Sequence, residues 1–503
     1  MVVTDISPHR RMMIVAAALL AVFLGALDAL IVSTAMPTIA SSLGGLELYS
    51  WVFSGYMLTR TIALPIFGKL SDMYSTKKLF AVSMGLFVIS SLSAGFVGTM
   101  PQLIALRTLQ GFAAGGTFAV SYIVVADVSP PEMRGKMMGL ISFVWGIASV
   151  LGPVLGGVIV TYLDWTWIFY INVPTGGAAL GAVLLYFREF REKRPQTSVD
   201  YLGAATLSAA VPAFLLAVML GGKEYRWDSP EIAGLILLAC VLGGAFVFAE
   251  SRAADPILRL GLMRNRGFVF SSTIVFFCSF AIFSLIAFIP LFVQGALAMK
   301  ASEVSIAMIP LSLGWSAGGL MGGNLMNRPG PKPICIIGSL LICAGISVAL
   351  SFSPETGLAS CCAVFAGVGV GMGFTFIATL IKAQNSLPKA DRGVATSSQQ
   401  FALNLGGTIG VGISGGILLT RTMETLREKA SASPDLSAMI PSAAQMSRHI
   451  QDLLSPEFHS TFSPQIIQAL KDSVASGVIA VFWTALAVSL LSVVLSLAMP
   501  GRD

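Results

Sequence analysis

Long apolar segments alternate with short polar connections along almost the whole chain. Each apolar segment holds about 20 residues, the length that an α-helix needs to cross the hydrocarbon core of a bilayer. A membrane β-barrel would instead show shorter segments in which polar and apolar residues alternate. The pattern therefore predicts fourteen membrane-spanning helices. We place them at residues 12–37, 49–70, 79–98, 102–126, 137–161, 166–187, 201–221, 232–249, 268–293, 304–325, 333–352, 358–381, 395–419 and 474–498.

The composition excludes a water-soluble fold. Of the 503 residues, 55% are hydrophobic and only 11% are charged, whereas a soluble domain carries about 25% charged residues. The predicted fold class is therefore an all-α polytopic membrane protein. All six cysteines lie in or at the ends of apolar segments, so the sequence indicates neither a disulfide framework nor a metal site.

Basic residues predict the orientation of the chain. The net charge is +6, and most of the 31 Lys and Arg residues fall in connections on the side of the membrane where both termini lie. Cytoplasmic loops carry such an excess. We therefore expect both termini in the cytoplasm, and the chain in a bacterial plasma membrane or inner membrane. Basic residues confined to short loops do not indicate nucleic-acid binding.

One acidic residue, Asp28, lies deep in the first span. The segment from Met12 to Met36 contains no other charged residue. An ionisable side chain at the bilayer centre costs about 3 kcal/mol or more unless it faces a partner or water. The other acids fall in loops, at span ends or in the tails, and the three histidines lie outside the spans. Asp28 is therefore the predicted proton-coupling residue.

Two arginines, Arg60 and Arg107, also lie within predicted spans. Counted from the outer span ends, Asp28 and Arg60 both lie about 15 Å deep. One interpretation is that they form a pair, and the other is a lipid-facing Arg60 whose side chain extends to the surface. Arg107 lies nearer the outer surface, and its side chain either faces the interior or extends outward.

The sequence contains an internal repeat. The run Gly68 to Asp72 follows the second span, and a related run, Gly323 to Asn327, follows the tenth span 255 positions later. Likewise, Glu132 to Gly135 precedes the fifth span, and Asp391 to Gly393 precedes the thirteenth. Such repeats are typical of secondary transporters. We expect a six-helix half at 1–194, two inserted helices at 195–266, and a second six-helix half at 267–503 with a long extracytoplasmic loop at 420–473.

Four strings carry a resemblance to a known family. The run Gly68 to Lys78 resembles the loop motif of the major facilitator superfamily, although Met73, Ser75 and Thr76 depart from it. Leu103 to Gly111 resembles a motif of its proton-coupled members. The string Trp165 to Gly176, together with Leu27 to Pro37, resembles the fourteen-span drug:proton antiporter family of the EmrB/QacA type. Thr166, Leu30 and Ser33 replace residues that are usual there, which points to a different substrate range.

The resemblance implies roles for particular residues. Arg107 and Gln110 would couple substrate binding to proton binding. Arg60 would take part as well, because its depth in the membrane matches that of Asp28. A gating network would involve Gly68, Asp72, Lys77, Asp127 and Arg134. A glycine-rich antiporter motif in the fifth span would comprise Gly146, Gly152, Pro153, Gly156 and Gly157.

An aromatic stripe in the ninth span, Phe276, Phe280 and Phe283, has helical spacing. Such a stripe either packs against a neighbouring helix or forms the apolar wall of a substrate site. The side chains that would complete that wall are Trp315, Gln400 and Asn404.

The predicted function is proton-coupled antiport that exports hydrophobic or amphiphilic compounds by alternating access. The alternatives are export of a lipid or another endogenous amphiphile, import of a nutrient, and a receptor or scaffold that transports nothing. No nucleotide-binding motif or catalytic triad is present in the sequence, so we expect no enzyme activity and no cofactor besides the proton. Expected partners are the bilayer and small substrates, with a monomeric chain and a periplasmic adaptor if the source has an outer membrane.

Overall fold

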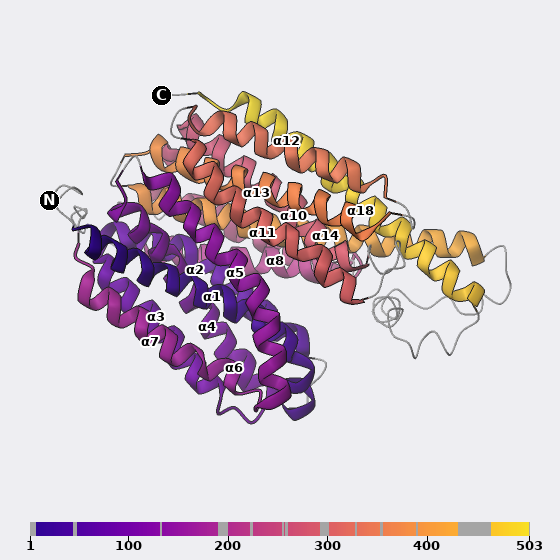
Figure 1. Ribbon diagram of the computed structural model, residues 1–503, viewed down its shortest axis with the longest axis horizontal. Coiled ribbons are helices and arrows are strands. Elements are labelled where there is room, and N and C mark those ends of the chain that lie inside the picture. Colours follow the sequence, from indigo (N-terminus) through magenta and orange to yellow (C-terminus); the bar gives the residue numbers. More distant parts are fainter. Residues whose placement is uncertain are drawn as a thin grey trace.

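The computed structural model is almost entirely α-helical over the residues that it describes (Figure 1). These are residues 7–43, 48–130, 133–189, 200–221, 225–253, 256, 260–291, 301–326, 329–352, 356–388, 391–430 and 464–501. The helices in the first half of the chain are α1 (Pro8–Leu43), α2 (Tyr49–Met73), α3 (Thr76–Ala94), α4 (Met100–Val128), α5 (Arg134–Tyr162), α6 (Trp167–Tyr170), α7 (Asn172–Tyr186), α8 (Tyr201–Leu220) and α9 (Pro230–Arg252). After a short 3₁₀ helix, η4 (Leu260–Arg264), follow α10 (Arg266–Leu291), α11 (Ala301–Leu325), α12 (Pro331–Ala349), α13 (Leu358–Ser386), α14 (Arg392–Ala430) and α18 (Pro464–Ala498).

The predicted all-α fold with fourteen spans is confirmed once the short α6 is counted with α7 as one broken helix. By length and composition, 11 helices of the described chain can cross a membrane, and α8 contains a shorter apolar run, Leu202–Val218. The two remaining long helices, α2 and α11, contact α14 and α5 of the opposite half. Helices are the expected solution in lipid, because every backbone polar group must find its partner within the segment.

The helices form two bundles that meet along two pairs of helices. Figure 1 shows α1 to α7 as one lobe and α10 to α18 as the other, with both chain ends on the same side. Helix α5 packs on α11, and α2 packs on α14. The inserted α8 and α9 pack on each other, and α8 lies against both α2 and α14. The predicted boundary at 194/195 lies outside the described residues.

The two bundles repeat the same close helix packing. In the first bundle, a Cβ atom on Gly111 of α4 would overlap the carbonyl oxygen of Tyr56 on α2. In the second bundle, a Cβ atom on Gly369 of α13 would overlap the carbonyl oxygen of Leu311 on α11. Small residues let helix backbones approach closely in membranes. The positions in these pairs are 258 and 255 apart, the same spacing as in the sequence repeat.

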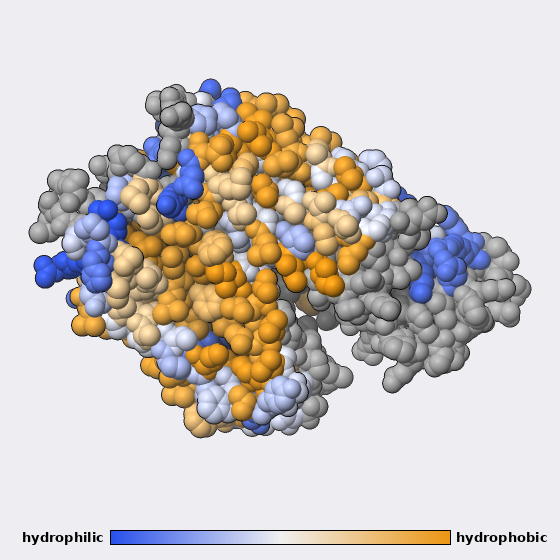
Figure 2. Space-filling view, in the orientation of Figure 1, coloured by the Kyte–Doolittle hydropathy of each residue, from blue (hydrophilic) through white to orange (hydrophobic). Residues whose placement is uncertain are grey.

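A broad hydrophobic surface surrounds the bundles. Figure 2 shows orange residues across the middle of this face, with hydrophilic residues gathered near the chain ends and at the far tip of the molecule. Large apolar side chains are exposed in the described chain, including Val82, Ile89, Leu237 and Val494, each at least 60% exposed. A surface of this kind fits a protein that lies in a membrane.

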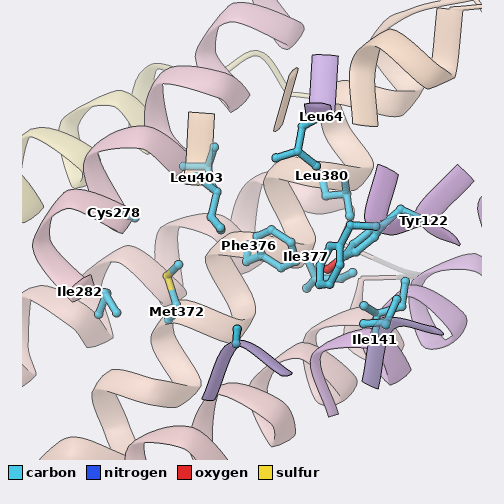
Figure 3. Close-up of a cluster of buried hydrophobic side chains, with 14 of the residues drawn as sticks. Leu64, Tyr122, Ile141, Cys278, Ile282, Met372, Phe376, Ile377, Leu380 and Leu403 are labelled. Carbon is cyan, nitrogen blue, oxygen red and sulfur yellow. The ribbon is translucent and has the colours of Figure 1, made fainter. Parts of the chain in front are cut away.

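Buried apolar side chains from both halves meet in one core. In Figure 3, Leu64, Tyr122 and Ile141 of the first half lie near Ile377 and Leu380 of the second. All belong to one hydrophobic cluster of buried residues. The halves are therefore joined by apolar packing in this region.

Two helices of the second half are longer than the bilayer requires. Helix α14 has 39 residues and α18 has 35, and 39 residues span about 58 Å. An ion pair of 2.5 Å joins Lys429 on α14 to Asp472 on α18. The segment predicted as a loop at 420–473 is therefore helical up to residue 430 and again from residue 464, and residues 431–463 lie outside the described chain.

Candidate functional site

Asp28 lies in the middle of α1 and is fully buried. Its Oδ2 atom forms an ion pair of 2.6 Å with the guanidinium of Arg107 on α4. Its Oδ1 atom accepts hydrogen bonds from the amides of Gln110, at 3.0 Å, and Asn172, at 2.9 Å. Three helices, α1, α4 and α7, therefore converge on one carboxylate.

Arg107 and Gln110 lie one turn apart on α4, a spacing that places both side chains on one helix face. Arg107 also donates a hydrogen bond of 2.8 Å to the amide oxygen of Gln110. Its guanidinium stacks on the ring of Tyr56 at 4.2 Å from the ring centroid. Because Arg107 is fully buried, the interpretation in which its side chain extends to the outer surface is wrong.

Asn172 reaches Asp28 because a helix breaks beside it. Helix α6 ends at Tyr170, and α7 begins at Asn172. Pro174 has no backbone N–H, and its ring would collide with the carbonyl group of Tyr170 in a continuous helix. The break therefore follows from the sequence, and it places Asn172 at the start of a new helix.

Ser91 on α3 completes the network. Its hydroxyl accepts hydrogen bonds from the amides of Asn172, at 2.8 Å, and Gln110, at 3.2 Å. The same hydroxyl donates a hydrogen bond of 3.0 Å to the carbonyl oxygen of Phe169, at the end of α6. Each amide nitrogen thus contacts both Asp28 and Ser91, which fixes the two amides in place.

The arrangement suits an ionised carboxylate. Arg107, Gln110 and Asn172 all direct N–H groups at the oxygens of Asp28. A carboxylate accepts from every one of them, whereas a protonated carboxyl group must itself donate a hydrogen bond. Protonation of Asp28 would therefore place an O–H among donors, so either Arg107 at Oδ2 or the two amides at Oδ1 would have to move.

Arg60 does not pair with Asp28. Its guanidinium lies over the rings of Phe118, at 4.5 Å, and Trp145, at 5.4 Å. The side chain is only 3% exposed, so the lipid-facing interpretation is wrong as well. Depth in the membrane does not fix the direction of a side chain around the bundle axis, and the arginine that binds Asp28 is Arg107.

The predicted gating residues lie near the end of the molecule where the chain termini lie. A Cβ atom on Gly68 of α2 would overlap the side chain of Ser397 on α14, so the two halves are in contact here. The backbone N–H of Lys77 donates a hydrogen bond of 2.9 Å to the carboxylate of Glu189. The sequence did not single out Glu189. Asp127 is half-buried at the end of α4. The side chains of Asp72 and Arg134 lie outside what the structure describes.

The glycine-rich motif of α5 faces two different helices. A Cβ atom on Gly146 would overlap Ser316 on α11 of the other half, and one on Gly152 would lie 2.8 Å from the Cβ of Leu30 on α1. Gly156 is buried, while Gly157 faces open space. The side chain of Pro153 is not described. The motif thus packs α5 both within its own half and against the other half.

The aromatic stripe of α10 packs on glycines of α14. Cβ atoms on Gly406 and Gly410 would overlap or crowd the carbonyl oxygens of Phe276 and Phe280, and one on Gly407 would lie 2.9 Å from the ring of Phe283. The α10 backbone at Phe276 and Phe280 therefore packs closely on α14, whereas only the ring of Phe283 makes such a contact.

The other side chains of the predicted wall have different surroundings. Phe283 also meets the ring of Trp315 edge-on at 6.2 Å. The side-chain amide of Asn404 donates a hydrogen bond of 2.7 Å to the carbonyl oxygen of Gln400 in its own helix. Gln400 itself is buried, beside the hydroxyl of Tyr122 on α4.

Three residues of the Asp28 network were missed in the sequence. Asn172 stands in the string from Trp165 to Gly176, and a polar residue two positions before Pro174 could have been singled out as part of a helix break. Tyr56 and Ser91 carry no such mark, because single hydroxyl groups are common in membrane helices.

The comparisons with known proteins agree on the kind of molecule. The Major Facilitator Superfamily matches residues 18–411. The chain is 34% identical over 495 residues to the multidrug transporter protein MdtP of Bacillus subtilis (strain 168), covering 95% of this chain and 91% of that protein. It is 32% identical over 481 residues to multidrug resistance protein 3 of the same organism, covering 96% of this chain and 93% of that protein.

Solved structures share the fold. The human organic anion transporter MFSD10 (TETRAN) matches with a TM-score of 0.64 and 12% identity, over 98% of this chain and 100% of that chain. The proton:xylose symporter XylE, bound to 6-bromo-6-deoxy-D-glucose, matches with a TM-score of 0.59 and 14% identity, over 98% and 96% of the two chains. At these identities the likeness concerns the fold alone.

Proposed function

The chain belongs to the major facilitator superfamily, and from that premise we propose that it is a proton-coupled antiporter that exports hydrophobic or amphiphilic compounds. Two relatives that are more than 30% identical over nearly the whole chain are named as multidrug proteins. They support export of several compounds over import of one nutrient. The finer assignment, coupling to protons, depends on the site around Asp28.

The observation that carries the proposal is the set of three donors around one buried carboxylate. Asp28 binds a proton only if Arg107 releases Oδ2 or the amides of Gln110 and Asn172 release Oδ1, because the new O–H would point at those donors. Either change loosens a contact between α1 and α4, and release of Oδ1 also loosens the contact with α7. Proton binding thereby changes how α1 packs in its bundle.

The proton supplies enough free energy for export against a gradient. One inward proton draws about 2.3 kcal/mol from each 100 mV of membrane potential, and a tenfold proton gradient adds about 1.4 kcal/mol. Together they support a concentration ratio of a few hundredfold for one substrate molecule per proton. No further energy source is needed for resistance to a toxic compound.

The contacts between the halves supply a gate. Two contacts between the halves lie at the end of the molecule where the termini lie. Gly68 on α2 meets Ser397 on α14. Gly139 on α5 meets Gly319 on α11, and a Cβ atom on Gly139 would lie 2.6 Å from the Gly319 carbonyl oxygen. With both termini in the cytoplasm, these contacts close the cytoplasmic side. Alternating access would require them to separate, while contacts form on the other side.

The test compares two Asp→Asn variants in everted membrane vesicles that acidify their interior by respiration. We expect Asp28→Asn to abolish concentrative, nigericin-sensitive uptake of ethidium or another exported dye, while downhill exchange continues. The matched control is Asp228→Asn in the α8–α9 loop. Its side chain is 69% exposed, and the hydrogen bond from Arg226 lowers the pKa of Asp228, so it stays ionised at working pH. Proton-dependent uptake at the wild-type rate in Asp28→Asn would overturn the proposal.

A further inference from the structure

Arg60 is a buried cation without an acceptor. Its side chain is 3% exposed, its Nε atom is buried without a hydrogen-bond partner, and it forms neither a hydrogen bond nor an ion pair with any described residue. Its described contacts are the ring faces of Phe118 and Trp145. Arg107, by contrast, binds Asp28 and Gln110 through its Nη1 atom, although its Nε and Nη2 atoms are also buried without a partner. The charge of Arg107 is thus matched by a carboxylate, whereas the charge of Arg60 has no such match among the described residues.

The charge balance of the interior is positive. Among the buried charged residues that the structure describes, Asp28, Arg60 and Arg107 lie well inside their helices. The others, Lys69, Glu250, Lys382 and Asp391, lie near helix ends. One acid therefore faces two arginines, and Asp28 is already matched by Arg107. Protonation of Asp28 would make the excess positive charge larger.

Aromatic contacts do not remove the need for an acceptor. Ring faces attract a guanidinium electrostatically, but they leave its N–H groups without hydrogen bonds, and buried polar groups are nearly always hydrogen-bonded. A structural arginine would therefore be expected to have a carboxylate or carbonyl partner. The missing partner of Arg60 is an acceptor that the described protein does not provide.

Arg60 lies where the two halves meet. Tyr122, which packs on Phe118 at 5.7 Å between ring centroids, lies beside both Arg60 and the amide of Gln400 on α14. The Nε2 atom of Gln400 is also buried without a hydrogen-bond partner. Two sets of buried donors, one from each half, are thus close to one tyrosine. A substrate site between halves is where transporters of this architecture bind their cargo.

The equivalent position in the second half supports this placement. A Cβ atom on Gly115 would overlap the carbonyl oxygen of Arg60, and one on Gly373 would overlap that of Trp315. Trp315 therefore corresponds to Arg60, and its Nε1 atom is likewise a buried donor with no partner among described residues. The two corresponding positions both offer N–H groups and an apolar surface.

We propose that Arg60 binds an acidic group of the exported substrate, such as a carboxylate or sulfonate, while the apolar body of the substrate lies against Phe118 and Trp145. The inference rests on the proposed function, because it names the substrate class of the same transporter. The guanidinium presents a planar set of donors that suits such oxyanions. Lipophilic cations would be repelled by the unpaired charge. The preferred cargo is an aromatic or amphiphilic acid.

The test measures binding to purified protein in nanodiscs, without a proton gradient. Two fluorescent probes share one ring system: N-phenyl-1-naphthylamine is neutral, and 1-anilinonaphthalene-8-sulfonate carries an acidic group. Empty nanodiscs give the lipid background. The variants are Arg60→Gln and Arg60→Lys. The matched control is Arg252→Gln, which removes an exposed arginine stacked on Phe248 at 4.2 Å near the end of α9.

We expect wild-type protein to bind the sulfonate more tightly than the neutral probe. In Arg60→Gln the affinity for the sulfonate should fall about 30-fold or more, as for other buried charge pairs, with the neutral probe nearly unchanged. Arg60→Lys should retain part of the preference, and Arg252→Gln should behave as wild type.

Two results would overturn the inference. One is a wild-type protein that binds both probes equally or prefers the neutral one. The other is an Arg60→Gln variant that keeps its sulfonate affinity or loses both probes together, because the latter would mean that Arg60 supports the fold and not the acidic group. Since no gradient is used, a failure of proton coupling in the Asp28→Asn experiment leaves this test unaffected.

Discussion

Arg107 and Gln110 on α4 correspond to Phe365 and Val368 on α13, 258 positions later in the chain. All four side chains are fully buried. The helix face that carries an arginine and an amide side chain in the first half is thus apolar in the second. The backbones around them pack alike, with Gly111 and Gly369 in matching contacts.

This difference shows how a repeated scaffold divides its tasks. Helix packing through small residues depends on backbone shape, so it survives in both halves. A buried charge costs desolvation free energy unless it is paired. Among the described residues, the buried ion pair lies in the first half, and the corresponding face of α13 is apolar.

The largest expected difference between the halves comes from replacing Arg107 in the first half and the corresponding Phe365 in the second. Arg107→Met leaves Asp28 buried without its ion pair, and we expect a loss of about 3–5 kcal/mol in unfolding free energy. Phe365→Met at the corresponding position should cost less than about 1.5 kcal/mol. Thermal unfolding in nanodiscs, followed by tryptophan fluorescence, measures both.

A double variant keeps this prediction specific. Asp28→Asn combined with Arg107→Met removes both charges, and its unfolding free energy should exceed that of Arg107→Met alone. Equal losses from Arg107→Met and Phe365→Met would contradict the proposed division between the halves.

A second prediction tests whether the close backbone packing contributes equally to stability in the two halves. Gly111→Ala and Gly369→Ala each add a methyl group where a carbonyl oxygen of the neighbouring helix lies. Both should lower the unfolding free energy by about 1–3 kcal/mol, as overpacking does. Gly98→Ala is the matched control, because nothing lies within 4 Å of its added Cβ. If only one of the two variants lowered the unfolding free energy, the helix packing of the two halves would not be energetically equivalent.

The smallest expected effects come from removing one hydrogen bond in each half. Asn172→Ala removes a donor from Asp28 and should cost about 1–2 kcal/mol. Because that donor contacts the carboxylate of Asp28, its loss should also slow proton-dependent uptake in the vesicle experiment. Ser339→Ala, which removes a hydroxyl pair with Ser496 at 2.9 Å, should cost about 1 kcal/mol and leave the uptake rate unchanged. Slower uptake in Ser339→Ala than in Asn172→Ala would contradict the proposed role of the first half.

The fold could be predicted because lipid permits few solutions. Apolar runs of sufficient length must be helices, and the internal repeat indicated the two halves. The predicted thirteenth span, residues 395–419, lies within α14, which extends beyond it to Ala430. The helix continues past the apolar run with charged residues such as Arg421 and Lys429, which a hydropathy pattern assigns to a loop.

The site could be predicted only in part. Asp28 and Arg107 stood out because charged side chains in spans are rare, and the family resemblance added Gln110. Depth pointed to Arg60 as a possible partner of Asp28, whereas the structure pairs Asp28 with Arg107. Rise per residue gives depth in the membrane, but the direction of a side chain depends on how helices are rotated against each other, which is a property of tertiary packing.

The length of α14 gives the molecule a lever arm. The helix begins beside the contact between Gly68 and Ser397 and extends about 58 Å to its far end, where Lys429 ties it to α18. If that contact serves as the fulcrum, a small rotation of the second half becomes a large displacement at the tip. A spectroscopic label near residue 429 would therefore report such a rotation as a large displacement.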